Sequence, residues 1–67
     1  MPAMSLTRYY YVELVDPNGT VVASELGFSP KEQERLFRKM QDSDLIMLHP
    51  TATIRKREEW KDPNEQP

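Results

Sequence analysis

The fold of this chain is decided by residues 8–26, RYYYVELVDPNGTVVASEL. Two stretches rich in aromatic and β-branched residues, which suit a half-buried pleated surface, flank the four residues DPNG at positions 16–19. Aspartate first, proline second and glycine last are typical of a type I turn that ends in a glycine bulge. The stretch therefore predicts a β-hairpin.

The turn also predicts how the two strands pair. If Asp16 lies opposite Thr20, counting outward gives three pairs on one face: Leu14 with Val22, Val12 with Ser24, and Tyr10 with Leu26. The opposite face then carries Tyr9, Tyr11, Glu13, Val15 and Val21. We expect the face that includes Leu14 to be the core face.

A capping box follows the hairpin. Ser29 can accept a hydrogen bond from the first turn of a helix, Glu32 can return one, and Pro30 occupies a position where no donor is needed. We therefore expect a helix of about three turns that begins at Pro30 and ends near Asp42. Its narrow apolar stripe packs on the sheet through Leu36, Phe37 and Met40.

The third strand is expected after the helix. The run Leu45–Leu48 is short and apolar, which favours a buried strand over a second helix. Pro50 interrupts it, and residues 51–54 resume the β character before the charged stretch 55–59. A right-handed crossover through the helix places this strand beside the first one. Ile46 or Met47 would then reach the sheet face away from the helix.

These elements predict one small α+β domain of β-β-α-β order over residues 7–61, between flexible end segments 1–6 and 62–67. Its three-stranded antiparallel sheet has the order 2-1-3, with one helix on one face, and leaves the other face open. A Tyr-rich open face is typical of an interaction surface or a dimer seam, which we expect at Tyr9, Tyr11, Val15 and Val21. The alternative is that the tyrosines are ordinary cross-strand pairs on a solvated sheet.

The composition limits both stability and chemistry. A core built from 67 residues supplies roughly 3–5 kcal/mol, so packing against another chain would help. With no Cys and one His, the sequence predicts no disulfide, no usual zinc site and no cofactor. His49 has no positioned nucleophile beside it, so we expect no enzyme. No signal segment and no apolar run of about 20 residues is visible, which predicts a cytoplasmic protein without membrane contact.

The charge balance bears on nucleic acids. Nine basic and eleven acidic residues give a net charge of −2, which argues against a general nucleic-acid binder. An alternative keeps Tyr9 and Tyr11 as a stacking platform for a single strand, with phosphate contacts from Arg8 and the run 55–57. That run is otherwise a solvated strand end that protects an edge. Trp60 either packs on the edge of the core or joins an interface.

A family resemblance is carried by the helix and the residues before it. Gly27-Phe28-Ser29 followed by Glu34 and Phe37 resembles a pattern of the very small uracil-DNA glycosylase inhibitors of phages that infect Gram-positive bacteria. The acidic turn that ends in Gly19 and the order of strands and helix are also similar. The likeness covers residues 8–55, and Gln33 stands where that family has a second aromatic residue.

The resemblance implies a phage-encoded homodimer that acts in the bacterial cytoplasm as a DNA mimic and occupies the DNA-binding groove of host uracil-DNA glycosylase. Glu34 would replace a phosphate, and Phe37 would form part of an apolar pocket. With them, Gln33 and Arg38 complete the expected protein-binding site, and the open sheet face forms the dimer seam. Two alternatives stay open: an inhibitor or adaptor of another host protein, such as a defence or replication factor, and a module that binds single-stranded nucleic acid through its tyrosines.

Overall fold

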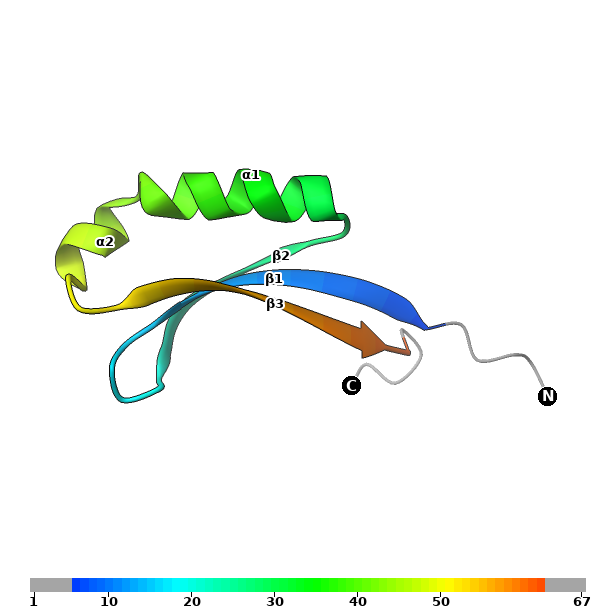
Figure 1. Ribbon diagram of the computed structural model, residues 1–67, viewed down its shortest axis with the longest axis horizontal. Helices are drawn as coiled ribbons and strands as arrows, with labels where there is room; N and C mark the ends of the chain where they lie inside the picture. Colours follow the sequence, from blue (N-terminus) through cyan, green and yellow to red (C-terminus); the bar gives the residue numbers. More distant parts are fainter. Residues whose placement is uncertain (1–5, 63–67) are drawn as a thin grey trace.

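The computed structural model describes residues 6–62, which form three strands and two helices (Figure 1). The elements are β1 (Thr7–Val15), β2 (Val21–Gly27), α1 (Pro30–Gln41), α2 (Asp44–Leu48) and β3 (Thr53–Lys61). The strands make one antiparallel sheet in the order β2-β1-β3, which confirms the predicted α+β class and sheet order. The predicted flexible segments 1–6 and 62–67 lie outside the described residues except for Leu6 and Asp62.

The hairpin turn forms as predicted. The main-chain N–H of Gly19 donates to the carbonyl oxygen of Asp16 at 2.9 Å, and the N–H of Asp16 donates to the carbonyl of Thr20 at 3.0 Å. The side chain of Asp16 accepts from the N–H groups of Asn18 and Thr20 at 2.9 and 3.0 Å. Gly19 has φ of 87°, a left-handed conformation that glycine adopts without steric cost. Backbone and side chain therefore close the turn together.

The predicted pairing beyond the turn is wrong by one residue. Val15 pairs with Val21 as expected, but Leu14 pairs with Ala23, so Val22 is an extra residue in a β-bulge. From there on the observed pairs differ from the predicted ones: Val12 lies opposite Glu25 and not Ser24, and Tyr10 lies opposite Gly27 and not Leu26. Because a shift of one residue exchanges the two faces of a strand, Ser24 and Leu26 lie on the face away from the helices.

The predicted strand at Leu45–Leu48 is also wrong, because these residues form α2. Ser43 caps this helix and accepts a hydrogen bond from the N–H of Leu45 at 3.1 Å. Serine at the cap and an acidic residue in the first turn both favour the start of a helix. Here this preference outweighs the tendency of the short apolar run to form a strand. Met47 is 81% exposed, and neither it nor Ile46 reaches the open side of the sheet. The strand β3 begins after α2 and contains the whole charged stretch 55–59.

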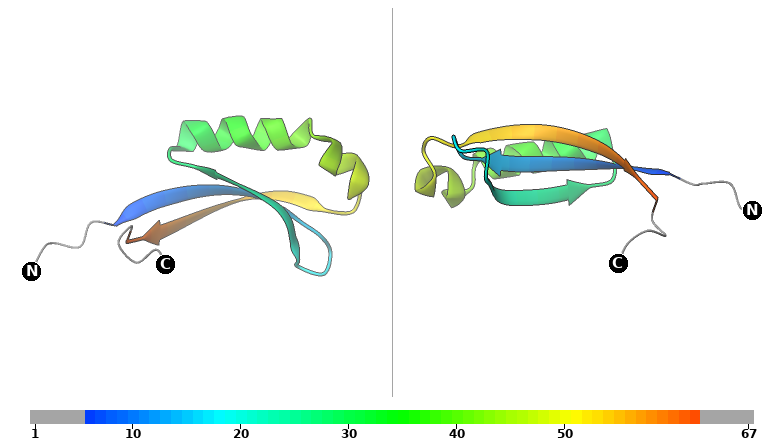
Figure 2. Two further views of the ribbon diagram at one scale, coloured as in Figure 1. Left: turned by 180° about the vertical axis from the view of Figure 1, so that it is seen from behind. Right: turned by 90° about the horizontal axis from the view of Figure 1, so that it is seen from below.

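Both helices lie on one side of the sheet, and none of the described elements covers the other side (Figures 1 and 2). The core between them is thin. Val12 and Leu14 of the central strand are fully buried, and Met40 of α1 is 4% exposed. Partly buried side chains pack around these three: Val22, Ala23, Leu36, Phe37, Leu45, Ile46, Ala52 and Ile54. The predicted core face of β1 and the apolar stripe of α1 are confirmed.

The start of α1 is fixed by its capping residues. The Oγ of Ser29 accepts from the N–H of Glu32 at 3.1 Å, and a carboxylate oxygen of Glu32 accepts from the N–H of Phe28 at 2.6 Å. A Cβ on Gly27 would lie 3.3 Å from the main-chain nitrogen of Gln33, so glycine lets the first helical turn approach the end of β2. The first turn of α1 therefore lies close against the end of β2.

Candidate functional site

The sheet face away from the helices, which we call the open face, is the candidate site. The central strand contributes alternate residues to it: Tyr9, Tyr11, Glu13 and Val15. Their partners on the outer strands are Glu59, Arg57, Arg55 and Thr53 of β3 and Leu26, Ser24 and Val21 of β2. All four residues predicted for an open sheet face therefore lie together, while their role as an interface stays a prediction.

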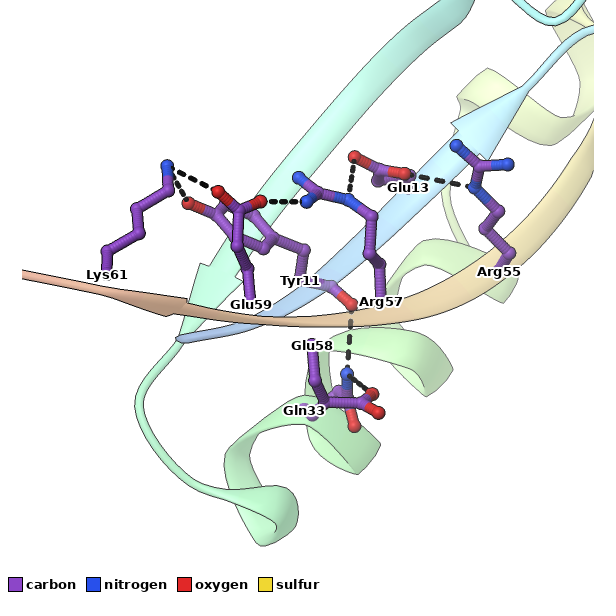
Figure 3. A network of polar contacts seen from close by, with 8 residues as sticks. All are labelled: Tyr11, Glu13, Gln33, Arg55, Arg57, Glu58, Glu59 and Lys61. Atoms are coloured by element: carbon purple, nitrogen blue, oxygen red, sulfur yellow. Dashed lines mark hydrogen bonds and ion pairs between the residues drawn. The ribbon is translucent and has the colours of Figure 1, made fainter. Parts of the chain in front are cut away.

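A row of charged side chains crosses the open face along β3 (Figure 3). Glu13 lies between two arginines: the Nε of Arg55 donates to its Oε1 and the Nε of Arg57 to its Oε2, each at 3.0 Å. Arg57 also donates to Glu59, and Lys61 pairs with Glu59 at 3.5 Å. Lys61 in turn donates to the phenolic oxygen of Tyr11 at 3.0 Å. We call these six residues the polar row.

The polar row keeps its carboxylates ionised. Glu13 is only 5% exposed, and burial alone would raise its pKa, but the hydrogen bonds and charges of Arg55 and Arg57 hold the pKa below its ordinary value of 4.5. The hydrogen bond from Arg57 lowers the pKa of Glu59 and raises that of Arg57. The pKa of Lys61 is raised, first by its hydrogen bond to Tyr11. The row therefore carries three cations and two anions at neutral pH.

Three aromatic rings lie along the polar row, one of them that of Tyr11 in the row itself, and we call Tyr9, Tyr11 and Phe28 the aromatic cluster. Tyr9 makes edge contacts with Tyr11 and Phe28, with ring centroids 6.5 and 5.8 Å apart. The guanidinium carbon of Arg57 lies 4.3 Å from the centroid of Tyr11, and the amine of Lys61 lies 5.4 and 5.9 Å from the centroids of Tyr11 and Tyr9. Phe28 is 63% exposed. The cluster thus offers apolar area bordered by hydrogen-bonding groups.

Two of the helix residues predicted to bind a target belong to the domain interior. Gln33 is 6% exposed, and its Nε2 donates to the main-chain oxygen of Tyr11 and to Glu58, both at 3.0 Å (Figure 3). Phe37 packs on the core, and the amine of Lys56 lies 5.1 Å from its ring centroid. Gln33 therefore joins α1 to the sheet. The aromatic residue that the resembled family has at this position could not make both hydrogen bonds.

The other two helix residues predicted for the target site are accessible. Glu34 forms ion pairs with Lys56 and, at 3.5 Å, with Arg38, whose side chain is 75% exposed. The hydrogen bond from Lys56 is the main reason that the pKa of Glu34 lies below its ordinary value. Glu34 and Arg38 thus lie together on the flank of α1 next to β3, with the charge of the carboxylate already offset by two cations.

Sequence reasoning missed several members of the open face. Arg55 and Arg57 lie two positions apart and thus share one face, but this signal depends on β3 extending through the charged stretch. The sequence predicts Glu13 on this face, opposite Ala23, and does not predict its two arginine partners. Phe28 follows the last strand residue, and Leu26 comes to this face through the bulge, for which the sequence gives no clear signal.

Trp60 and His49 lie away from the open face. Trp60 is 60% exposed on the helix side of the sheet, where the guanidinium carbon of Arg8 lies 5.5 Å from its ring and 5.4 Å from that of Tyr10. Trp60 is therefore not a core residue. His49 ends α2, and its N–H donates to the carbonyl of Leu45 at 2.9 Å.

Comparison with protein-family models, with curated proteins and with solved structures found no match to this chain. Over residues 6–62, no helix is long and apolar enough to cross a membrane. The same part of the chain contains no group of three or more His, Cys, Asp or Glu side chains placed to hold a metal ion. The geometry of the described residues defines a small α+β domain with one uncovered sheet face.

Proposed function

We propose that this protein acts by binding another protein, and that the open face is one of its interfaces. The supporting observation is that the aromatic cluster and the polar row share one sheet face that no described element covers. Tyr, Phe and Arg are the residue types enriched in protein interfaces. Rigid rings supply contact area at a low entropy cost, and the arginines supply hydrogen bonds around them.

The charge pattern of the open face favours a protein partner of mixed charge. Each carboxylate of the polar row already has cationic partners on the same face. A docked protein would therefore not leave Glu13 or Glu59 unpaired, which is the costly situation for a buried charge. Glu13 is already shielded from water at 5% exposure, so binding adds little desolvation there.

A second copy of this chain is the first partner that we propose for the open face. The core is thin, with Val12 and Leu14 as the fully buried side chains among residues 6–62, so covering the rings of the aromatic cluster would stabilise the domain. The polar row alternates in sign from Arg55 to Lys61. Because the row begins and ends with a cation, a second copy in antiparallel orientation places anions opposite cations when it is displaced by one position along the row, and this register favours association.

We further propose that the homodimer is an inhibitor, with uracil-DNA glycosylase as the candidate target that the sequence resemblance suggests. In a dimer formed by open faces, both α1 helices point outward, and Glu34 and Arg38 are available on each. A groove that binds phosphates is lined with cations, which would compete with Lys56 and Arg38 for the Glu34 carboxylate. Another host protein remains the alternative target.

Light scattering tests the interface. We expect the mass of a dimer for the wild type and of a monomer for Leu26→Lys, because Leu26 is 40% exposed on the open face and a buried lysine there would lack a partner. Met47→Lys is the matched control, since Met47 is 81% exposed on α2 and should leave the dimer intact. A monomeric wild type would reject the proposed dimer.

The target is tested separately by measuring uracil excision from DNA by a bacterial uracil-DNA glycosylase. The proposal expects excision to stop at a stoichiometric excess of the wild type and to be partly restored for Glu34→Gln. If excision is untouched at that excess, the glycosylase is not the target. Capture of partners from a bacterial lysate, with Glu34→Gln as the comparison, then addresses the alternative target.

One observation favours a second candidate function, the binding of single-stranded nucleic acid. Arg55 and Arg57 share a face with Tyr9 and Tyr11, as a stacking platform with phosphate contacts requires. Both arginines are engaged by Glu13, however, and Arg57 lies over the ring of Tyr11. This function predicts salt-sensitive retention of a labelled single-stranded oligonucleotide that a Tyr9→Ala, Tyr11→Ala double substitution abolishes. Retention that is absent at low salt would exclude it.

A further inference from the structure

The outer edge of β2 is unpaired and weakly protected. Among the described residues β2 pairs only with β1, and Figure 2 shows it as the outermost strand on its side of the sheet. Proteins protect such edges with charged residues, lysine above all, with proline or with β-bulges, and the bulge of β2 lies at its turn end, at Val22. The opposite edge strand, β3, is charged at every position from 55 to 59, whereas β2 has one charged residue, Glu25, and no proline. The edge of β2 is therefore open to main-chain hydrogen bonds.

An apolar pocket lies directly beside this edge, between β2 and the two helices. Its floor consists of four apolar side chains, Ala23, Leu36, Met40 and Leu45, and its rim of Glu25, Lys39 and Ser43. The volume of about 60 Å³ is well below the roughly 150 Å³ that holds a benzene ring. The pocket therefore suits one small aliphatic side chain.

We propose that an extended peptide segment of another protein adds to β2 as a fourth strand and places an aliphatic side chain in this pocket. Strand addition combines main-chain hydrogen bonds, which supply affinity, with a side-chain pocket, which supplies selectivity. The proposed site lies at the other side of the sheet from the open face and does not depend on dimer formation.

Charge on α1 indicates what kind of peptide fits. Lys39 borders the pocket with a side chain that is 71% exposed, and its ion pair with Glu25 is long, at 3.9 Å. Arg35 lies one helical turn before Lys39, and within residues 6–62 it has no carboxylate at ion-pair distance. Acidic side chains two positions before and after the aliphatic one lie on the same side of an extended peptide and can reach these cations.

The same charges disfavour a second copy at this edge. Antiparallel pairing of two β2 strands would form a continuous sheet with both α1 helices on one face, one on each side of the joined edges. Lys39 and Arg35 of each copy would then face their equivalents, and like charges across an interface are destabilising. An acidic peptide is therefore the occupant that the surface favours.

Fluorescence anisotropy with a labelled, capped heptapeptide, Thr-Glu-Thr-Val-Thr-Glu-Thr, tests the proposal. We expect saturable binding to the wild type and at least about tenfold weaker binding of a matched peptide with lysines in place of the glutamates. Two further peptides carry N-methyl groups on alternate amides, either on the threonines or on the other three residues. Only one of these two sets faces β2, so one N-methylated peptide should lose binding and the other should keep it.

Protein variants locate the site. Lys39→Glu should weaken peptide binding about tenfold, since it replaces an attraction by a repulsion. Arg38→Glu makes the same charge change in the same helix on the flank next to β3, and should have little effect. Ala23→Leu fills the pocket and should also weaken binding, with its far-UV circular dichroism compared with that of the wild type. Leu26→Lys on the open face should leave binding unchanged, which separates this site from the proposed dimer interface.

Several results would overturn the proposal. They are the absence of saturable binding to the wild type, equal affinity for the acidic and the lysine peptide, and equal affinity for the two N-methylated peptides. A Lys39→Glu variant that binds as well as the wild type would do the same. So would a wild-type dimer that Lys39→Glu stabilises and Leu26→Lys leaves intact, because a second copy would then occupy the edge.

Discussion

The Nε of Arg57 donates to the carboxylate of Glu13 at 3.0 Å, on the sheet face that no described element covers. Glu13 is nonetheless buried, with 5% exposure, and Arg55 binds its second oxygen at the same distance. A carboxylate with so little access to water depends on its protein partners to remain ionised. The polar row is therefore part of what holds β1 and β3 together, whatever binds the open face.

Replacing Glu13 should destabilise the fold. In Glu13→Ala two arginines lose their partner, but both are partly exposed and water can solvate them, so we expect a loss of about 2 kcal/mol in the free energy of unfolding. Urea denaturation followed by circular dichroism measures this loss. Glu25→Ala is the control, because Glu25 is exposed and its ion pair is 3.9 Å long, and it should change stability by less than about 0.5 kcal/mol. Equal losses in the two variants would contradict the role given to Glu13.

The lowered pKa of Glu13 predicts how stability depends on pH. Its pKa is below 4.5 in the folded state and near 4.5 in the unfolded chain, so its ion pairs stabilise the fold above about pH 4.5. This contribution is lost as the pH falls through the folded-state pKa. Glu34 and Glu59 are shifted in the same direction and act in the same range.

Urea midpoints measured from about pH 7 down to about pH 3 test this dependence. The wild type should lose stability on acidification, and Glu13→Gln should lose less over the same range because one of the three shifted carboxyls is gone. Parallel curves for the two proteins would mean that Glu13 does not contribute to the pH dependence.

Local signals predicted those parts of the fold that depend on neighbouring residues in the chain. Asp16 and Gly19 build the turn, and Ser29 and Glu32 build the start of α1. In each pair the two residues lie within five positions of each other in the chain. The apolar periodicity of β1 then identified Val12 as a core residue. Each of these features involves contacts that the sequence shows directly.

The errors arose where a long-range contact or a weak local preference decides the structure. The bulge at Val22 moves Ala23 to the helix side, where it lines the pocket, and no residue in β2 marks this shift. Leu45–Leu48 is apolar in every position, so periodicity cannot separate a strand from a helix there. At the site, the alternation of side chains along β1 predicts that Tyr9 and Tyr11 share a face. The partners of Glu13 depend instead on the register of β3, which cannot be predicted when the third strand is expected to begin at Leu45.

Gln33 should contribute to stability and not to target binding. Its side-chain amide joins α1 to the main-chain oxygen of Tyr11 and to Glu58, so Gln33→Ala loses two hydrogen bonds and leaves a cavity. We expect a loss of about 2 kcal/mol, measured by urea denaturation. Gln41→Ala, at an exposed position in the last turn of the same helix, should stay within about 0.5 kcal/mol of the wild type. A Gln33→Ala variant as stable as this control would mean that Gln33 does not hold the helix to the sheet.

The two methionines Met40 and Met47 form a matched pair for the core. Met40 is 4% exposed and Met47 is 81% exposed. Met40→Ala should cost about 2–5 kcal/mol, which is comparable to the whole stability expected of so small a domain, and should leave the chain largely unfolded at 25 °C. Met47→Ala should unfold at the same urea concentration as the wild type. Circular dichroism decides the comparison, and a folded Met40→Ala variant would mean that the core extends beyond the thin layer between α1 and the sheet.

Replacing Phe28, whose ring makes an edge contact with Tyr9, should affect the stability of the domain much less than its association. Phe28 is 63% exposed, so Phe28→Ala removes little buried area within one chain and should cost less than about 1 kcal/mol. If the aromatic cluster lies in a dimer interface, the same change removes a ring that two chains bury, and dimer affinity should fall at least about tenfold. Analytical ultracentrifugation over a range of concentrations measures this affinity, with Met47→Ala as the control for loss of an exposed apolar side chain. A dimer whose dissociation constant is the same in Phe28→Ala and in the wild type would place the interface away from the aromatic cluster.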